Sequence, residues 1–248
     1  MIALRRLCCL VILLAIVAVP RSTAAELVAA LSNHLVAITT GFTGSEVLLF
    51  GTTSGGGDVV VVIRGPEEPH VVRRKGRRLG IWLNEKEMRF ESVPAFYSVA
   101  ASRPLNEFLP DRVAARHQIG VENIRLMPAP DTASDDLNDF RAALIRNKQK
   151  INLYATKTAA VTFLGGRLFR TDMYIPANAP VGNYTVGVYL VRDEDVVSAE
   201  ITPLIVSKVG FEARLSDFAK RFSLAYGILA IVIATVAGWL ANLVFRRG

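Results

Sequence analysis

The chain has 248 residues and a formal charge of +7, from 29 Lys and Arg against 22 Asp and Glu. Three of the arginines lie in residues 1–25, and without them the balance falls to 26 − 22 = +4, which excludes the bulk basic character of a nucleic-acid-binding protein. Both cysteines, Cys8 and Cys9, lie in the same segment, so residues 26–248 have no disulfide, no cysteine-ligated zinc and no redox motif.

Residues 1–25 have the pattern of a secretory signal peptide. Arg5 and Arg6 precede an apolar run, Leu7 to Val19, that is too short to cross a bilayer comfortably. Small residues lead up to Ala25, after which we expect cleavage, and an uncleaved anchor is the alternative. In both cases residues 26–210 are expected in the periplasm.

Short runs rich in Val, Ile, Leu and Thr predict β-strands in the first part of this exported region, at residues 35–40, 46–53 and 58–65. The run from Val59 to Ile63 is apolar on both faces, so we expect that strand at the centre of a sheet.

A block of cations surrounds Gly76: Arg73, Arg74, Lys75, Arg77 and Arg78. Apolar pairs and triplets flank it, which predicts a hairpin whose tip lies at Gly76 and carries a compact, exposed cationic knob. Such a knob would bind an acidic partner protein or another anionic ligand. A solvated loop that only keeps an edge strand from pairing is the alternative.

Helical periodicity replaces strand periodicity between residues 102 and 150, first over 102–120 and then over 131–150. Strands return at 167–176, 183–192 and 196–206. The pattern predicts a mainly β fold, an immunoglobulin-like β-sandwich with a helical insertion at about 102–150, and two small β domains are the alternative. Tyr184 begins a strand after a Pro/Gly turn, where sandwiches of this class place a tyrosine that hydrogen-bonds back to the turn.

The C-terminal segment predicts membrane attachment. Residues 211–223 have the pattern of an amphipathic juxtamembrane helix, and 224–245 form an uncharged stretch of transmembrane length, followed by a cytoplasmic tail at 246–248. We therefore expect a single-pass protein of the inner membrane. Small residues at every fourth position could pack against a second membrane helix, namely Ala230, Ala234 and Gly238.

No catalytic constellation is recognisable, and we predict no metal, no cofactor and no enzymatic activity. His34, His70 and His117 are scattered, and the acidic residues near 131–139 lack the spacing of a calcium loop and suit a helix N-terminus. An envelope hydrolase or metal-dependent enzyme whose site is assembled from distant residues is the alternative hypothesis.

Four stretches carry a resemblance to a known family: GFTGSEVLLFG (41–51), VVVVIRGP (59–66), VRRKGRRLGIWLN (72–84) and VPAFYSVAASRPL (93–105). Together with the closing apolar segment, they resemble the family of alphaproteobacterial transmembrane proteins over nearly the full chain. The resemblance implies an envelope protein of this topology and supplies no catalytic residues. Such proteins are similar in setting to sulfite-exporter-type membrane proteins, which implies an accessory role to an anion exporter.

Overall fold

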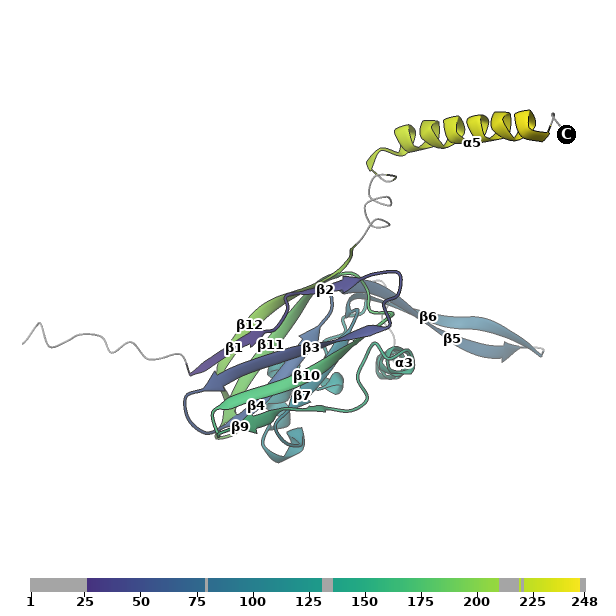
Figure 1. The fold of residues 1–248 in the computed structure, drawn as a ribbon. Coiled ribbons are helices and arrows are strands. Elements are labelled where there is room, and N and C mark those ends of the chain that lie inside the picture. The colour runs from purple at the N-terminus through teal and green to yellow at the C-terminus, as the bar shows by residue number, and fades with distance from the viewer. Residues whose placement is uncertain (1–25, 79, 131–135, 210–218, 220, 246–248) are drawn as a thin grey trace, which may run out of the picture.

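The computed structural model describes residues 26–78, 80–130, 136–209, 219 and 221–245. The predicted signal peptide, most of the predicted juxtamembrane helix and the predicted tail at 246–248 lie outside these residues. Figure 1 shows a body of two facing β-sheets from which a long β-hairpin projects.

The two sheets of the body contain most of the strands. The first has the order β1 (Leu27–Leu31), β3 (Gly44–Thr53), β10 (Leu168–Pro176), β9 (Thr162–Leu164). The second has the order β2 (Leu35–Ile38), β12 (Asp195–Lys208), β11 (Gly182–Arg192), β4 (Asp58–Arg64), β7 (Tyr97–Ala101), β8 (Ala159–Ala160). The prediction of a mainly β fold is confirmed, and six of the observed strands begin and end within about two residues of the predicted ranges.

One hydrophobic core lies between the sheets. Strand β4 is paired with β11 on one side and β7 on the other, and its five apolar residues, Val59 to Ile63, are all buried. The predicted central strand is therefore confirmed. Buried residues of both sheets belong to a single cluster, in which Val61 of one sheet and Phe169 of the other are both fully buried.

The predicted hydrogen bond of Tyr184 is also confirmed. Its ring is 1% exposed and packs near Phe96, with ring centroids 5.8 Å apart. Its hydroxyl donates to the Pro180 carbonyl at 2.7 Å, which fixes the turn before β11.

Four helical segments lie between β7 and β8 in the described residues. They are η1 (Leu105–Glu107), α2 (Asp111–His117), η2 (Val121–Asn123) and α3 (Leu137–Lys150). The helical pattern predicted at 102–120 is divided into η1 and α2, which follow Pro104 and Pro110, because Pro110 disfavours helical geometry at Leu109. Helix α3 ends at Lys150 as predicted and contributes Phe140 and Leu144 to the core cluster, whereas 131–135, at the start of the predicted range, lie outside the described residues.

Helix α5 (Ser223–Phe245) occupies the range predicted for the membrane span. Its side chains are exposed where they are described, including Leu224 and Trp239. Within the described part of the chain, however, no helix satisfies the length and apolarity expected of a membrane-crossing segment. The predicted transmembrane helix is therefore not supported by these residues.

The projecting hairpin consists of β5 (Glu67–Arg78) and β6 (Ile81–Pro94), which pair only with each other along most of their length. We call it the arm. Twelve residues at about 3.4 Å each make β5 about 40 Å long. At its base the arm begins directly after β4, and the Ala95 amide donates to the Pro66 carbonyl at 2.7 Å, which closes the base.

Candidate functional site

The arm is the candidate site because it projects from the body and has exposed apolar and cationic side chains among the described residues. Strand β5 ends at Arg78 and β6 begins at Ile81, so the tip lies beyond the predicted position. Gly76 lies inside β5, opposite Leu83, and the prediction that it forms the tip was wrong. Glycine suits this position because a Cβ atom there would collide with the Glu85 carboxylate.

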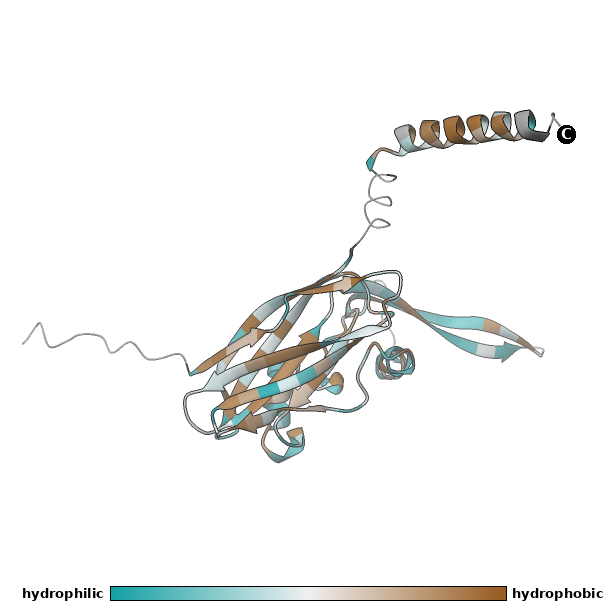
Figure 2. Cartoon of the chain, viewed as in Figure 1, coloured by the Kyte–Doolittle hydropathy of each residue, from teal (hydrophilic) through white to brown (hydrophobic). Residues whose placement is uncertain are grey.

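Three apolar side chains in succession are exposed next to the tip. Ile81 is 63%, Trp82 65% and Leu83 50% exposed. Figure 2 shows that the arm is largely hydrophilic, with an apolar section toward its free end. Large apolar residues grouped in this way on a projection are typical of interaction sites.

Ion pairs divide the predicted cationic residues into two groups. Arg73 Nε lies 3.0 Å from Glu87 Oε2, and Arg78 Nε lies 2.9 Å from Glu85 Oε1. These pairs are within the arm and largely exposed, so each contributes at most about 1 kcal/mol to stability. They nevertheless neutralise much of the charge that the sequence predicts for a knob.

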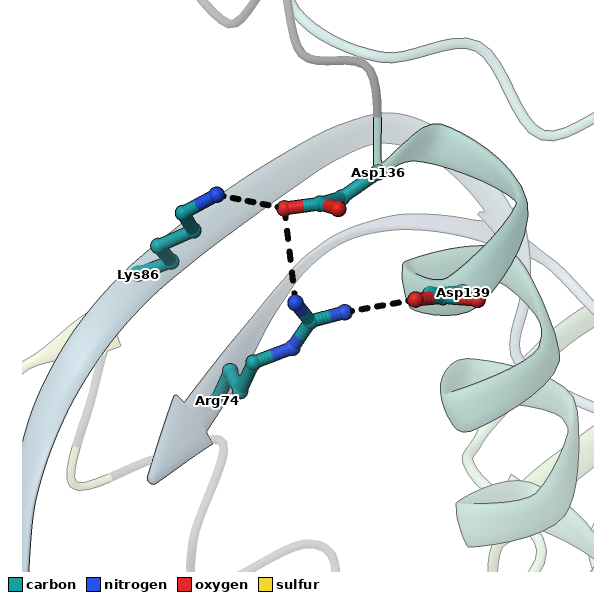
Figure 3. A network of polar contacts seen from close by, with 4 residues as sticks. All are labelled: Arg74, Lys86, Asp136 and Asp139. Carbon is teal, nitrogen blue, oxygen red and sulfur yellow. Dashed lines mark hydrogen bonds and ion pairs between the residues drawn. The ribbon is translucent and has the colours of Figure 1, made fainter. Parts of the chain in front are cut away.

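Arg74 belongs to a network that joins the arm to α3 (Figure 3). Its guanidinium lies 3.4 Å from Asp136 Oδ2 and 2.9 Å from Asp139 Oδ2, and 5.1 Å from the centre of the Phe140 ring. Lys86 Nζ, from the other strand of the arm, lies 2.6 Å from Asp136 Oδ2. Both acidic residues lie at the start of α3, where a negative charge also interacts favourably with the helix dipole.

The same network lowers the pKa of Asp136. The hydrogen bond from Lys86 is the main cause, and the nearby charge of Arg74 acts in the same direction. The acidic residues that the sequence suggested as a helix N-terminus therefore also hold the arm, although Asp131 and Asp135 lie outside the described residues.

Lys75 and Arg77 form the second group. In the described residues, neither takes part in an ion pair. Lys75 pairs with Asn84 and Arg77 with Trp82 in the β-ladder. Cross-strand partners share a face of a ribbon, as do residues two apart in one strand, so these four side chains lie together on one face.

A groove of about 520 Å³ lies between β5 and α3. Lys75 and Arg146 are cationic residues on its two walls, and Phe140 and Ala143 contribute apolar surface. Arg74 also lines it but is held by the carboxylates of α3. The groove extends the cationic character of the arm toward the body, and sequence reasoning missed it because its walls lie some seventy residues apart.

A buried polar cluster lies where the arm meets the body. Among the described residues, the Nδ1 atom of His70 on β5 is buried and has no hydrogen-bond partner, and Lys148 on α3 is only 4% exposed. Burial is the main cause that lowers the pKa of both groups, and the charge of Lys148 contributes to the lowering at His70. The charge of Glu68 opposes both shifts.

The other histidines lie on different elements. His34 precedes β2 and is exposed, whereas His117 ends α2 with its ring 5.5 Å from that of Tyr189. No group of three or more His, Cys, Asp or Glu residues able to hold a metal ion occurs in the described parts of the chain.

The predicted helix-packing residues Ala230, Ala234 and Gly238 lie on α5 at successive turns and are exposed. The described residues place no side chain or backbone atom within 4 Å of a Cβ atom built at Gly238. This face can therefore accept a close approach.

Comparison with known proteins gives one family. The model of a family described as "Putative transmembrane protein (Alph_Pro_TM)" matches residues 26–247. No curated protein and no solved structure matches the chain.

Proposed function

The chain belongs to this family, and from that premise we propose that it is a non-enzymatic binding module whose arm engages an anionic partner at a membrane. The observation that carries the proposal is the arm itself. It exposes Ile81, Trp82 and Leu83 beside Lys75 and Arg77, two cations without an ion pair among the described residues. Trp and Arg are the residues most enriched among those that dominate binding energies.

We propose α5 as the anchor of this module, with the body in the periplasm and the C-terminus in the cytoplasm. The support is the uncharged stretch 224–245 and the signal peptide pattern of residues 1–25. The partner we propose for α5 is an integral membrane protein of the anion-exporter type. Small residues at every fourth position, Ala230, Ala234 and Gly238, support contact with a second membrane helix, and the exporter type is suggested by the family resemblance of the sequence.

We also infer that the body is immunoglobulin-like. Two features support this assignment: the hydrogen bond from Tyr184 to the turn before β11, and the division of the N-terminal strands between the two sheets, with β1 in one and β2 in the other.

Site-specific photocrosslinking in intact cells tests the role of the arm. A photoreactive amino acid at position 82 is expected to crosslink to a component of the envelope. The same photoreactive amino acid at position 201, which is also exposed, is expected to crosslink to none. The double substitution Lys75→Gln and Arg77→Gln should lower the yield at position 82. Equal capture at both positions, or none at position 82, contradicts the proposal.

Cysteine labelling tests the orientation, because residues 26–248 contain no cysteine. A membrane-impermeant maleimide should label Ile201→Cys in spheroplasts. Gly248→Cys should react only after the membrane is permeabilised, and the reverse pattern refutes the topology.

A further inference from the structure

We infer that the tip of the arm docks onto the anionic phospholipid surface of the membrane in which α5 is anchored. This inference rests on the proposed function and names the partner of the arm as a lipid surface.

The position of the arm in the fold is the first argument. The start of β11 connects the ends of β4 and β12. Its residue Thr185 pairs with Arg64, the last residue of β4, and its residue Gly182 pairs with Val206, near the end of β12. Only two residues separate the end of β4 from the start of the arm, and a Cβ atom at Gly182 would lie 2.9 Å from one of them, Pro66. The base of the arm and the end of β12 are therefore neighbours at the same end of the sheet.

This arrangement places the arm at the end of the body from which the chain continues toward α5. If α5 is the anchor, that end faces the membrane. A ribbon about 40 Å long that starts there can extend to the lipid surface without any rearrangement of the body.

The distribution of apolar side chains at the tip is the second argument. Alternation along β6 places Trp82 on one face of the ribbon and both Ile81 and Leu83 on the other, and all three are at least half exposed. A protein partner that covers one face would leave the other apolar face in water. A lipid interface surrounds an inserted tip and contacts both faces.

The charges give the third argument. Tryptophan is favoured at the level of the lipid headgroups, where its ring meets both apolar and polar surroundings. Arg77 lies opposite Trp82 in the ladder, and Lys75 follows on the same face. These cations would meet anionic headgroups while the apolar side chains enter the interface, and each cation near such a surface strengthens docking about fivefold.

Fluorescence quenching of Trp82 tests the inference in the full chain. The sequence has two tryptophans, so Trp239→Phe leaves Trp82 as the sole emitter. This protein is reconstituted into phosphatidylcholine vesicles that contain phosphatidylglycerol and acyl chains brominated near the headgroup, which quench tryptophan on contact. We expect strong quenching of Trp82, and much weaker quenching in vesicles of phosphatidylcholine alone or at 1 M salt, where charges are screened within about 3 Å.

Two double substitutions distinguish an effect of the cations of the arm from an effect of the net charge of the protein. Lys75→Gln with Arg77→Gln should lower the ratio of docked to undocked arms about 30-fold, from about fivefold for each charge. Arg167→Gln with Arg170→Gln is the matched control. It removes the same charge from exposed positions beside β3 residue Thr52, at the opposite end of the body, and should leave quenching unchanged.

The outcomes distinguish this inference from the proposed function. Quenching that depends on phosphatidylglycerol and on the two cations supports docking to lipid. If brominated lipid does not quench Trp82 while position 82 still crosslinks to a protein in cells, the lipid inference is overturned and the proposed function stands. If neither occurs, both are overturned.

Discussion

Replacing Tyr154 with phenylalanine tests whether a buried hydrogen bond holds the base of the arm. The Tyr154 hydroxyl donates to the carbonyl of Pro94, the last residue of β6, at 2.8 Å. Because the ring is 1% exposed, phenylalanine preserves its packing and removes only the donor. Leaving a buried acceptor unpaired costs about 1–2 kcal/mol, which corresponds to a fall in Tm of about 2–8 °C for a protein of this size.

Thermal unfolding of the detergent-solubilised full chain, followed by near-ultraviolet circular dichroism, measures this loss. Tyr174→Phe is the matched control. Its hydroxyl also donates to a backbone carbonyl, that of Thr43 at 2.9 Å, but the side chain is 55% exposed, so water can replace the bond and the free energy of unfolding should change by less than about 0.5 kcal/mol. Equal falls in Tm for the two variants would refute the reasoning. Amide exchange at Ala95, which closes the base of the arm, should accelerate only in Tyr154→Phe.

Three further changes test the buried cluster and α5. Burial keeps the pKa of His70 below its ordinary 6.5, so the unfolded chain takes up a proton first as the pH drops. The free energy of unfolding should therefore fall below about pH 6.5. Urea unfolding of His70→Leu at the same pH values should not show this fall. Lys148→Met removes a buried charge and should raise the free energy of unfolding by about 1 kcal/mol. Lys150 is exposed, so the control Lys150→Met should change the free energy of unfolding by less than about 0.5 kcal/mol. If Lys148→Met is instead less stable than the unchanged protein, the charge of Lys148 has a stabilising partner. Ala234→Leu with Gly238→Leu should abolish co-purification of a membrane partner, and an intact complex would exclude this interface.

The six strands of the body that were predicted each carry their own local signal. Val59 to Ile63 is apolar on both faces and is buried on both, and alternation in 167–176 matches the alternating burial of β10. Tyr184 was predictable for the same reason, since the Pro/Gly turn and the strand that follows it are adjacent in sequence. In each case the decisive residues lie within about ten positions of one another.

The arm was predicted only in part, because glycine has two roles in β-structure. Gly76 was taken as a turn, yet it accommodates the Glu85 side chain inside a strand, next to a shift in register between Arg74 and Lys75. The strand therefore continues for two further residues. Nothing near Gly76 in the sequence indicates that a glutamate nine residues later will occupy the space of its missing side chain.

The charge state of the candidate site depends on contacts between distant segments. Five cations in six residues predict a uniform knob, but the carboxylates that pair with Arg74 come from α3, more than sixty residues away. Sequence reasoning therefore overestimated the charge available to a partner. The apolar residues at 81–83 were assigned to a strand, which is correct, but a two-stranded ribbon leaves both of its faces without a covering layer.

The cations of β5 have different roles: one of them stabilises the position of the arm, and others are available to bind a partner. Near the body, Arg74 joins the arm to α3, with Lys86 of the facing strand bound to the same carboxylate. Farther out, Lys75 and Arg77 have no such partner among the described residues and lie beside Trp82. A ribbon of two strands has too little buried surface to be rigid without support, so the inner ion pairs stabilise the arm where the body can supply carboxylates. Lys75 and Arg77, which form no ion pair with the carboxylates of α3 among the described residues, are left available for binding, so substitutions at Arg74 should affect the position of the arm and those at Arg77 its affinity.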